Sequence, residues 1–369
     1  MKIMDYTTER KQDIDLTVTY HSAVDLLLSL WAIGSKDCGD PIDELEIGDD
    51  FLDEIVANIS PSTKTALENI RSGDVWIALL SLVPSAGEGG SVRDFIAFLD
   101  EHDSVDLRSR MVWLYQEFDR AESIIAAQAA AGDADAVEKL LGLAAFDHPS
   151  KKVWRDSLRY LLHLTPDATR ELLVATLTDL QESGFDKHEL AFREYLETDA
   201  RAKQSMATRL SPERLVEIAS NGISIEEKRI TTPVVLMPTM VARPWVVLAE
   251  SPDMFIMGYP VSDRTLLSDP DAPPQWLVKL HKALGDERRL KILRRLAEDD
   301  ASLVELSTEL DVSKSTLHHH MMLLRAAGLI KVHVGEDKRY SLRDETLPEA
   351  ATYLNHYIHK SNESREEQT

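Results

Sequence analysis

The chain has 369 residues, of which 43% are hydrophobic and 28% are charged, and it carries a net charge of −23 and a single cysteine, Cys38. It is longer than one ordinary domain, and its composition is typical of a folded globular protein. No apolar run reaches the roughly 18 residues of a membrane span, and the start MKIMDYTTERKQDIDL lacks an apolar signal core, which predicts a cytoplasmic protein. A lone cysteine excludes an intrachain disulfide and a thiolate metal cluster.

The acidic charge is unevenly distributed. Residues 1–274 carry a net charge of −22 and residues 344–369 carry −4, whereas residues 275–343 carry +3. A mildly basic segment favours salt-sensitive binding to a few phosphates of a nucleic acid, with the number of contacts doubled by dimerisation. The acidic remainder of the chain would repel nucleic acid and so disfavour non-specific binding.

Helical patterns dominate residues 21 to 220, where segments such as DLLLSLWAI and ATRELLVATLTDLQESGF have apolar residues at three- and four-residue spacing. The run DLTVTY near the start predicts one strand, and the stretch VVLMPTMVARPWVVLAESPDMFIMGYPV predicts a short strand meander. Residues 1–265 contain no phosphate-binding loop, dinucleotide fingerprint, zinc-protease motif or serine-hydrolase motif. We therefore do not expect an enzyme.

Three residues of the strand stretch are candidate ligand-binding residues: Arg243, Trp245 and Tyr259. In this interpretation Arg243 binds an anion and the two aromatic rings line a pocket. The alternative is that the rings anchor the sheet on the helices and that Arg243 pairs with a nearby carboxylate, because aromatic residues in strands mostly pack.

A proline-rich segment, SDPDAPPQ at residues 268–275, separates two patterned regions. Prolines interrupt both helices and sheets, so this segment is the predicted linker. We expect an N-terminal domain at residues 1–267 that binds an effector or forms a dimer, a second domain at 276–360, and a disordered tail at 361–369.

The second domain is predicted to contain three helices, a tight turn, a fourth helix and two short strands, which is the order of a winged helix-turn-helix. The first helix of the turn motif begins at Ser302, and Glu305 three residues later completes a capping box. Leu303, Leu306 and Leu310 form its buried stripe.

The following helix is expected to extend from Ser313 to Ala327 and to stop at Gly328. A recognition helix enters the major groove of DNA by its N-terminal end, where the helix dipole also favours phosphate. Met322 is expected to project to the side of the DNA contacts. The candidate contacts on this helix are Ser313, Lys314, Ser315, Thr316, His318 and His319.

Two alternating runs, Ile330–Val334 and Arg339–Arg343, flank Gly335 and predict the hairpin that forms the wing. Lys338 and Arg339 are expected to approach the DNA backbone or the minor groove. Acidic residues at the tip of the wing oppose this approach, so the helix is the main predicted contact.

Three motifs make this segment specific: KALGDERRLKILRRL, then ELSTELDVSKSTLHHHMMLLRAAGLI, then RYSL in the wing. In the second motif Ser313, Thr316 and His320 precede LLRAAGL. The segment, about one fifth of the chain, resembles the ArsR-type family of bacterial transcription regulators. The resemblance implies a dimeric, repressor-type DNA binder whose subunit interface is formed by helices at 276–284 and 347–358.

Metal-sensing members of that family carry a Cys-Val-Cys arrangement in the first motif helix, where this chain has LVEL at 303–306. His356 and His359 alone would make a weak zinc site. The consecutive histidines 318–320 point about 100° apart on a helix and cannot converge on one ion. We therefore expect no metal and no other cofactor.

The sequence thus predicts a mainly α fold with small β elements: a large helical N-terminal region ending in short strands, followed by a winged helix-turn-helix. The predicted function is that of a cytoplasmic, homodimeric repressor that binds double-stranded DNA and no membrane, with a small-molecule effector of unknown identity. Two alternatives stay open: a protein-interaction scaffold whose winged helix does not bind DNA, and an N-terminal enzyme fused to its own regulator.

Overall fold

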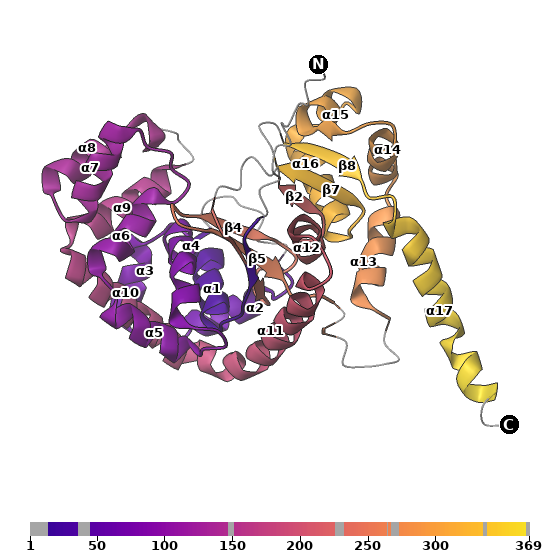
Figure 1. Ribbon diagram of the computed structural model, residues 1–369, viewed down its shortest axis with the longest axis horizontal. Coiled ribbons are helices and arrows are strands. Elements are labelled where there is room, and N and C mark those ends of the chain that lie inside the picture. Colours follow the sequence, from indigo (N-terminus) through magenta and orange to yellow (C-terminus); the bar gives the residue numbers. More distant parts are fainter. Residues whose placement is uncertain are drawn as a thin grey trace, which may run out of the picture.

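The computed structural model describes residues 14–35, 45–146, 151–225, 232–263, 265–266, 273–334 and 338–366. Most of the predicted linker, the wing turn at Gly335 and the single cysteine lie outside these ranges. Figure 1 shows a body of helices, a small central sheet, and the winged helix on the far side of that sheet. The fold is mainly α with small β elements, as the sequence predicts.

The helical body is built from short helices joined by tight connections. Pro61 and Pro166 each occupy the first turn of a helix, where the missing N–H costs nothing. The helices are α1 (Ala23–Ser35), α2 (Asp49–Val56), α3 (Pro61–Asn69), α4 (Asp74–Leu79), α5 (Val92–Glu101), α6 (Ser104–Trp113), α7 (Arg120–Ala130), α8 (Ala134–Leu141), α9 (Lys152–His163), α10 (Pro166–Leu180), α11 (Asp186–Ala207) and α12 (Pro212–Ala219).

Helix α1 is the centre of this body because it is apolar on every face, and residues 23–30 are all buried. Its one charged residue, Asp25, is fully buried and accepts hydrogen bonds from the Thr239 hydroxyl and from the backbone N–H groups of Met240 and Val241. A buried carboxylate needs such donors. Asp25 therefore fixes α1 to the chain that leaves the central sheet.

The central sheet contains β1 (Leu16–Val18), β3 (Val234–Thr239), β5 (Phe255–Pro260) and β4 (Val247–Glu250), in that order. Strands β1, β3 and β5 are parallel, and only β4 is antiparallel to β5. The predicted strands are present, but their pairing is not that of a meander, because β3 and β5 are direct parallel neighbours. The chain between them crosses over to place β4 at the edge.

Alternate side chains of β3 enter different cores. Val235 and Met237 pack with α1 in the large helical core, whereas Val234 and Leu236 pack with α11 in a second core. This is the period-two alternation of a strand covered on both faces. The sheet is thus enclosed between α1 on one side and α11 with α12 on the other (Figure 1).

The winged helix has its own core, formed by leucines of several helices and by Val332 and Tyr340 of the wing. A second sheet in the order β2-β7-β8-β6 covers this core. The elements are β2 (Ile223–Ile225), α13 (Gln275–Leu284), α14 (Glu287–Leu296), β6 (Ala301–Ser302), α15 (Leu303–Glu309), α16 (Lys314–Ala326), β7 (Ile330–Val334), β8 (Arg339–Leu342) and α17 (Thr346–Glu366).

Two features differ from the sequence predictions. Strand β2 precedes the predicted linker by more than forty residues yet pairs in parallel with β7 of the wing. Helix α17 continues to Glu366, into the segment predicted as a tail, and no Gly or Pro interrupts KSNESRE; residues 367–369 of the predicted tail lie outside the described residues. Figure 1 shows α17 projecting away from the rest of the molecule. None of the helices that the structure describes is long and apolar enough to cross a bilayer.

Candidate nucleic-acid interface

The first helix of the turn motif, α15, begins as predicted. The Ser302 hydroxyl accepts from the Glu305 N–H at 3.2 Å, and the Glu305 carboxylate accepts from the Ser302 N–H at 2.7 Å. This capping box satisfies two N–H groups that a helix start otherwise leaves unpaired. Leu306 is fully buried beneath it, and Asp311 then makes the turn with φ +51. The tight turn sets α16 at its angle to α15.

Helix α16 is capped by Ser313, whose hydroxyl accepts from the Thr316 N–H at 3.2 Å and lies 2.8 Å from the Thr316 hydroxyl. These two hydroxyls therefore hold the start of the helix as well as facing solvent. Lys314 and Ser315 are exposed in the same first turn. The positive end of the helix dipole and a lysine thus coincide at one place, which suits a phosphate.

Further along α16, His318 and His319 are exposed while Leu317 and His320 are buried. The exposed histidines lie on the predicted contact face. Met322 is also buried, so its prediction as an outward residue is wrong. The reason is that α13, α14, α15 and β7 all pack against α16, which makes its buried face wider than one narrow stripe.

His320 is the inward member of the three histidines. Neither ring nitrogen has a hydrogen-bond partner among the described residues. Burial lowers the pKa of His320 against the opposing effect of Asp286, which caps the start of α14. The ring is therefore neutral at neutral pH and acts as a packing residue of the winged helix.

The wing residues differ in how free they are to reach DNA. Arg339 is held by Glu305, whose carboxylate lies 3.4 Å away, and it donates to the Asp300 carbonyl at 2.5 Å. Lys338 is exposed, with its ammonium 5.8 Å from the centre of the Tyr340 ring. Of the two predicted wing contacts, Lys338 is the more accessible.

One residue that sequence reasoning did not single out is Arg288, exposed in the first turn of α14. It lies close enough to His320 of α16 to contribute to the lowered pKa of that ring. It therefore adds positive charge beside the recognition helix. The motif GDERRL that contains Arg288 was the one signal for it in the sequence. That helix has five basic residues, however, and the sequence gave no basis for choosing Arg288 among them.

The two helices expected to form a subunit interface lie side by side. Trp276 of α13 meets Tyr353 of α17 edge to face, with ring centres 5.0 Å apart. Large apolar side chains are left exposed on α17, including Leu347 at 40%, Tyr353 at 41% and Ile358 at 57%. An isolated surface rarely leaves several such residues along one helix.

The three candidate ligand residues occupy packing and ion-pair positions. Arg243 is buried and pairs with Glu46 at 2.8 Å and with Asp263. Tyr259 is fully buried in the sheet core, and the Trp245 ring lies beneath the guanidinium of Arg325. These contacts match the alternative in which the rings anchor the sheet and the arginine meets carboxylates. The three side chains do not line the cavity described next.

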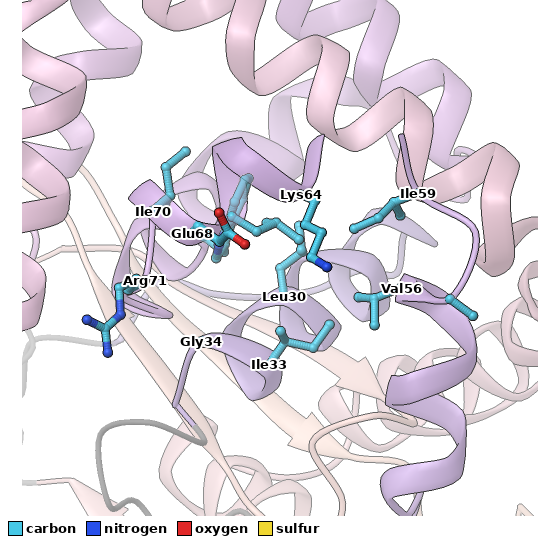
Figure 2. A pocket seen from close by; sticks show the side chains of 12 residues that line it. Leu30, Ile33, Gly34, Val56, Ile59, Lys64, Glu68, Ile70 and Arg71 are labelled. Atoms are coloured by element: carbon cyan, nitrogen blue, oxygen red, sulfur yellow. The ribbon is translucent and has the colours of Figure 1, made fainter. Parts of the chain in front are cut away.

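A cavity of about 660 Å³ lies elsewhere, between α1, the α2–α3 connection and α4 (Figure 2). Most of its lining is apolar, including Leu30 and Ile33 of α1 and Trp76 of α4, and the charged residues Lys64, Glu68 and Arg71 line it as well. Figure 2 shows the Lys64 ammonium turned toward Leu30 and Ile33, with Arg71 pointing away from them. No ion pair of Lys64 occurs within the part of the chain that the structure describes. An apolar space of this size with a cation at its mouth can accept a drug-sized molecule.

No group of three or more potential metal ligands occurs among the described residues. The side chain of His356 lies outside them, and His359 is exposed on α17.

Comparison with known proteins places similarity in the winged helix. A model of the bacterial regulatory protein, arsR family, matches residues 286–332. The transcriptional repressor SdpR of Bacillus subtilis is 30% identical over 80 residues, which cover 21% of this chain and 89% of SdpR. The transcriptional activator HlyU of Vibrio cholerae is 45% identical over 53 residues, which cover 14% of this chain and 49% of HlyU. The chain thus spans about half the length of HlyU.

Among solved structures, an ArsR-like transcriptional regulator from Rhodococcus sp. RHA1 is 31% identical, with a TM-score of 0.23. The match covers 24% of this chain and 86% of that one.

Proposed function

The chain belongs to the bacterial arsR family of regulatory proteins, and from that premise we propose that it is a sequence-specific DNA-binding transcription regulator. It acts in the cytoplasm as a homodimer and reads the major groove with helix α16. The observation that carries the proposal is the exposed, capped start of α16, where Lys314, His318 and His319 face solvent beside Arg288. Helices α13 and α17 supply the subunit interface.

We place repression ahead of activation. SdpR and the SmtB homolog of Synechocystis are named repressors, whereas HlyU is named an activator. A dimer bound across an operator blocks polymerase without any further contact. Repression therefore needs no surface that binds polymerase, whereas activation does. The net charge of −23 limits non-specific DNA binding and leaves specific contacts to dominate.

The effector that we propose for this regulator is an amphipathic anion in the cavity of Figure 2. The apolar walls would bury its hydrocarbon part, and Lys64 at the mouth would meet its charged group. Helix α1 lines this cavity with Leu30 and Ile33. Near the start of the same helix, Asp25 accepts a hydrogen bond from the Met240 N–H, just after β3 ends. A shift of α1 on binding would therefore reach the sheet that adjoins the winged helix.

The DNA-binding proposal is tested by a salt-dependent gel-shift assay with the chain's own upstream promoter. The double variant Lys314→Ala, His319→Ala should abolish the specific shift, because it removes a phosphate contact and a base contact. The matched control, Lys139→Ala, His163→Ala, changes the same residue types on the helical body and should bind as the wild type does. Absence of a specific shift with the wild type would favour the interaction scaffold instead.

A further inference from the structure

The N-terminal region contributes a strand to the wing. Strand β2 pairs in parallel with β7, with Ile223 opposite Val332 and Ile225 opposite Val334. Just before it, the Val332 N–H donates to the Gly222 carbonyl at 2.7 Å. A β-hairpin wing normally presents an open edge at this position, and here the edge is paired.

The residue before that glycine, Asn221, caps the recognition helix from outside. Its side-chain amide donates to the carbonyls of Arg325 and Ala326 at 3.1 and 3.0 Å. Both carbonyls belong to the last turn of α16, where helix acceptors need partners beyond the helix; the Arg325 carbonyl also accepts from the Gly328 N–H at 2.8 Å. The Asn221 side-chain oxygen also accepts from Arg343 at 3.4 Å, which joins the far end of the wing to the same residue.

The backbone of Asn221 and Gly222 has the conformation that these contacts with α16 and the wing require. Asn221 has φ +55 and Gly222 has φ +107, and a Cβ on Gly222 would lie 2.7 Å from the Ile330 carbonyl oxygen. Any side chain at position 222 would therefore push the wing away. The residue types Asn and Gly are those that tolerate a left-handed backbone.

Helix α16 in turn inserts a charged side chain into the N-terminal region. The Arg325 guanidinium lies over the Trp245 ring, 5.4 Å from its centre, and donates toward the Ser220 carbonyl at 3.5 Å. Burial lowers the pKa of Arg325 to about 10, so the group stays charged at neutral pH. A buried cation on an aromatic face is a strong and directional contact.

We propose that Asn221 and Trp245 are positioning residues for DNA recognition. They set the orientation of α16 and the wing. The N-terminal region thereby controls, by direct contact, how the DNA-binding surface is oriented. This inference rests on the proposed DNA-binding function. The contacts hold the C-terminal end of α16, whereas the DNA contacts lie at its N-terminal end, about 20 Å away for 13 residues. A rotation of about 10° at the held end would displace the contact residues by about 3 Å, which is the length of a hydrogen bond.

The test compares Asn221→Gly with the wild type. Glycine keeps the positive φ and removes the side-chain amide, with its bonds to the two carbonyls and to Arg343, whereas alanine would add backbone strain. Asn69→Gly is the matched control, since the Asn69 amide also donates to a helix carbonyl but lies on the distant helix α3. Trp245→Leu removes the aromatic face, and Trp245→Phe keeps it.

Two measurements are made on each full-length variant: affinity for the upstream promoter by fluorescence anisotropy, and amide hydrogen exchange in residues 322–334. We expect Asn221→Gly and Trp245→Leu each to weaken specific binding by roughly tenfold and to speed exchange in the last turn of α16. Trp245→Phe should restore most of the affinity, and Asn69→Gly should change neither quantity. Circular dichroism at 222 nm should be the same for all of them.

Full wild-type affinity in both Asn221→Gly and Trp245→Leu, with exchange accelerated, would overturn the positioning role and leave the DNA-binding function standing. Failure of the wild type itself to bind the promoter specifically would overturn the proposed function and the positioning role together. Loss of affinity with unchanged exchange would also overturn the proposal, because the effect would then not pass through α16.

Discussion

His21 and Asp25, one turn apart at the start of the buried helix α1, should give the protein two opposing pH dependences of stability. His21 is 1% exposed; its Nδ1 accepts from the Ala23 N–H, and its Nε2 has no partner among the described residues. Burial, opposed by the charge of Asp94, lowers the pKa of His21 to about 4. Burial also raises the pKa of Asp25 to about 6, against the hydrogen bonds that it accepts.

The magnitudes follow from these pKa values. Between pH 6.5 and 4 the unfolded chain binds a proton at His21 that the folded chain does not, so acid destabilises the fold. At pH 5 the loss is about 2 kcal/mol. For Asp25 the folded state holds the extra proton between pH 6 and 3.8, so the fold gains about 1 kcal/mol at pH 5 relative to pH 7.

The assay is reversible urea unfolding at several pH values between 7 and 5. His21→Asn retains a side-chain acceptor for the Ala23 N–H but does not titrate in this range. Relative to the wild type, its free energy of unfolding should rise by about 2 kcal/mol between pH 7 and 5. The carboxylates that titrate elsewhere contribute equally to both proteins and cancel.

A constant difference between His21→Asn and the wild type over this pH range would refute the reasoning, because it would mean that His21 titrates alike in both states. Asp25→Asn provides a second check of opposite sign, since it should lose stability relative to the wild type as the pH falls from 7 to 5.

Three other predictions concern the interface, the cavity and the helical body. Ile358→Glu places a charge on the exposed face of α17 and should raise the dissociation constant of the dimer at least tenfold, as measured by sedimentation equilibrium. Leu190→Glu, at a residue 70% exposed on α11, should leave the dissociation constant unchanged. The anionic dye 8-anilinonaphthalene-1-sulfonate should gain fluorescence with the native protein, and Lys64→Glu should suppress the gain while Lys139→Glu does not; equal fluorescence in both variants would remove the cavity as its site. Arg108→Met should cost about 3 kcal/mol or more and lower the melting temperature, because the buried guanidinium donates to three backbone carbonyls that would lose their partner.

The winged helix could be predicted because its signals are local. The capping box at Ser302, the N-cap at Ser313 and the left-handed Gly328 each act within a few residues, and the structure contains all three. The helix bounds agree with the prediction to one residue at each end. Local hydrogen-bonding chemistry decides such features, so a single sequence is enough to read them.

The coupling to the N-terminal region could not be predicted in this way. Strand β2 has three residues, ISI, and pairs with a strand more than a hundred positions later. Nothing in Asn221-Gly222 distinguishes an ordinary turn from a cap on a distant helix. Arg325 has the sequence context of a surface arginine, yet it is buried, with Trp245 of the N-terminal region against its guanidinium. Residues whose role depends on a remote partner carry no periodicity that reveals them.

The setting of the three candidate ligand residues could not be predicted from the sequence for a related reason. Arg243 has an isolated position in the sequence, but Glu46 and Asp263 meet it from two distant segments, and Lys279 of α13 joins the same carboxylates. The cavity, in contrast, is lined mostly by ordinary apolar residues of α1 to α4 and their connections, which no motif marks. Shape arises from how helices pack and not from the type of any one residue.

The pairing of β2 with β7 has a consequence for how the chain is made. Asn221 leaves the ribosome about a hundred residues before its acceptors Arg325 and Ala326, so the N-terminal region must wait on the order of ten seconds with a bare strand edge. The proline-rich segment is then not a place where the gene could be cut into two working pieces. The first piece would carry one strand of the four-stranded sheet and the capping Asn221, and the second would carry the other three strands and the helix that Asn221 caps. Exchanging the winged helix with that of a relative would require transplanting residues 220–225 along with it.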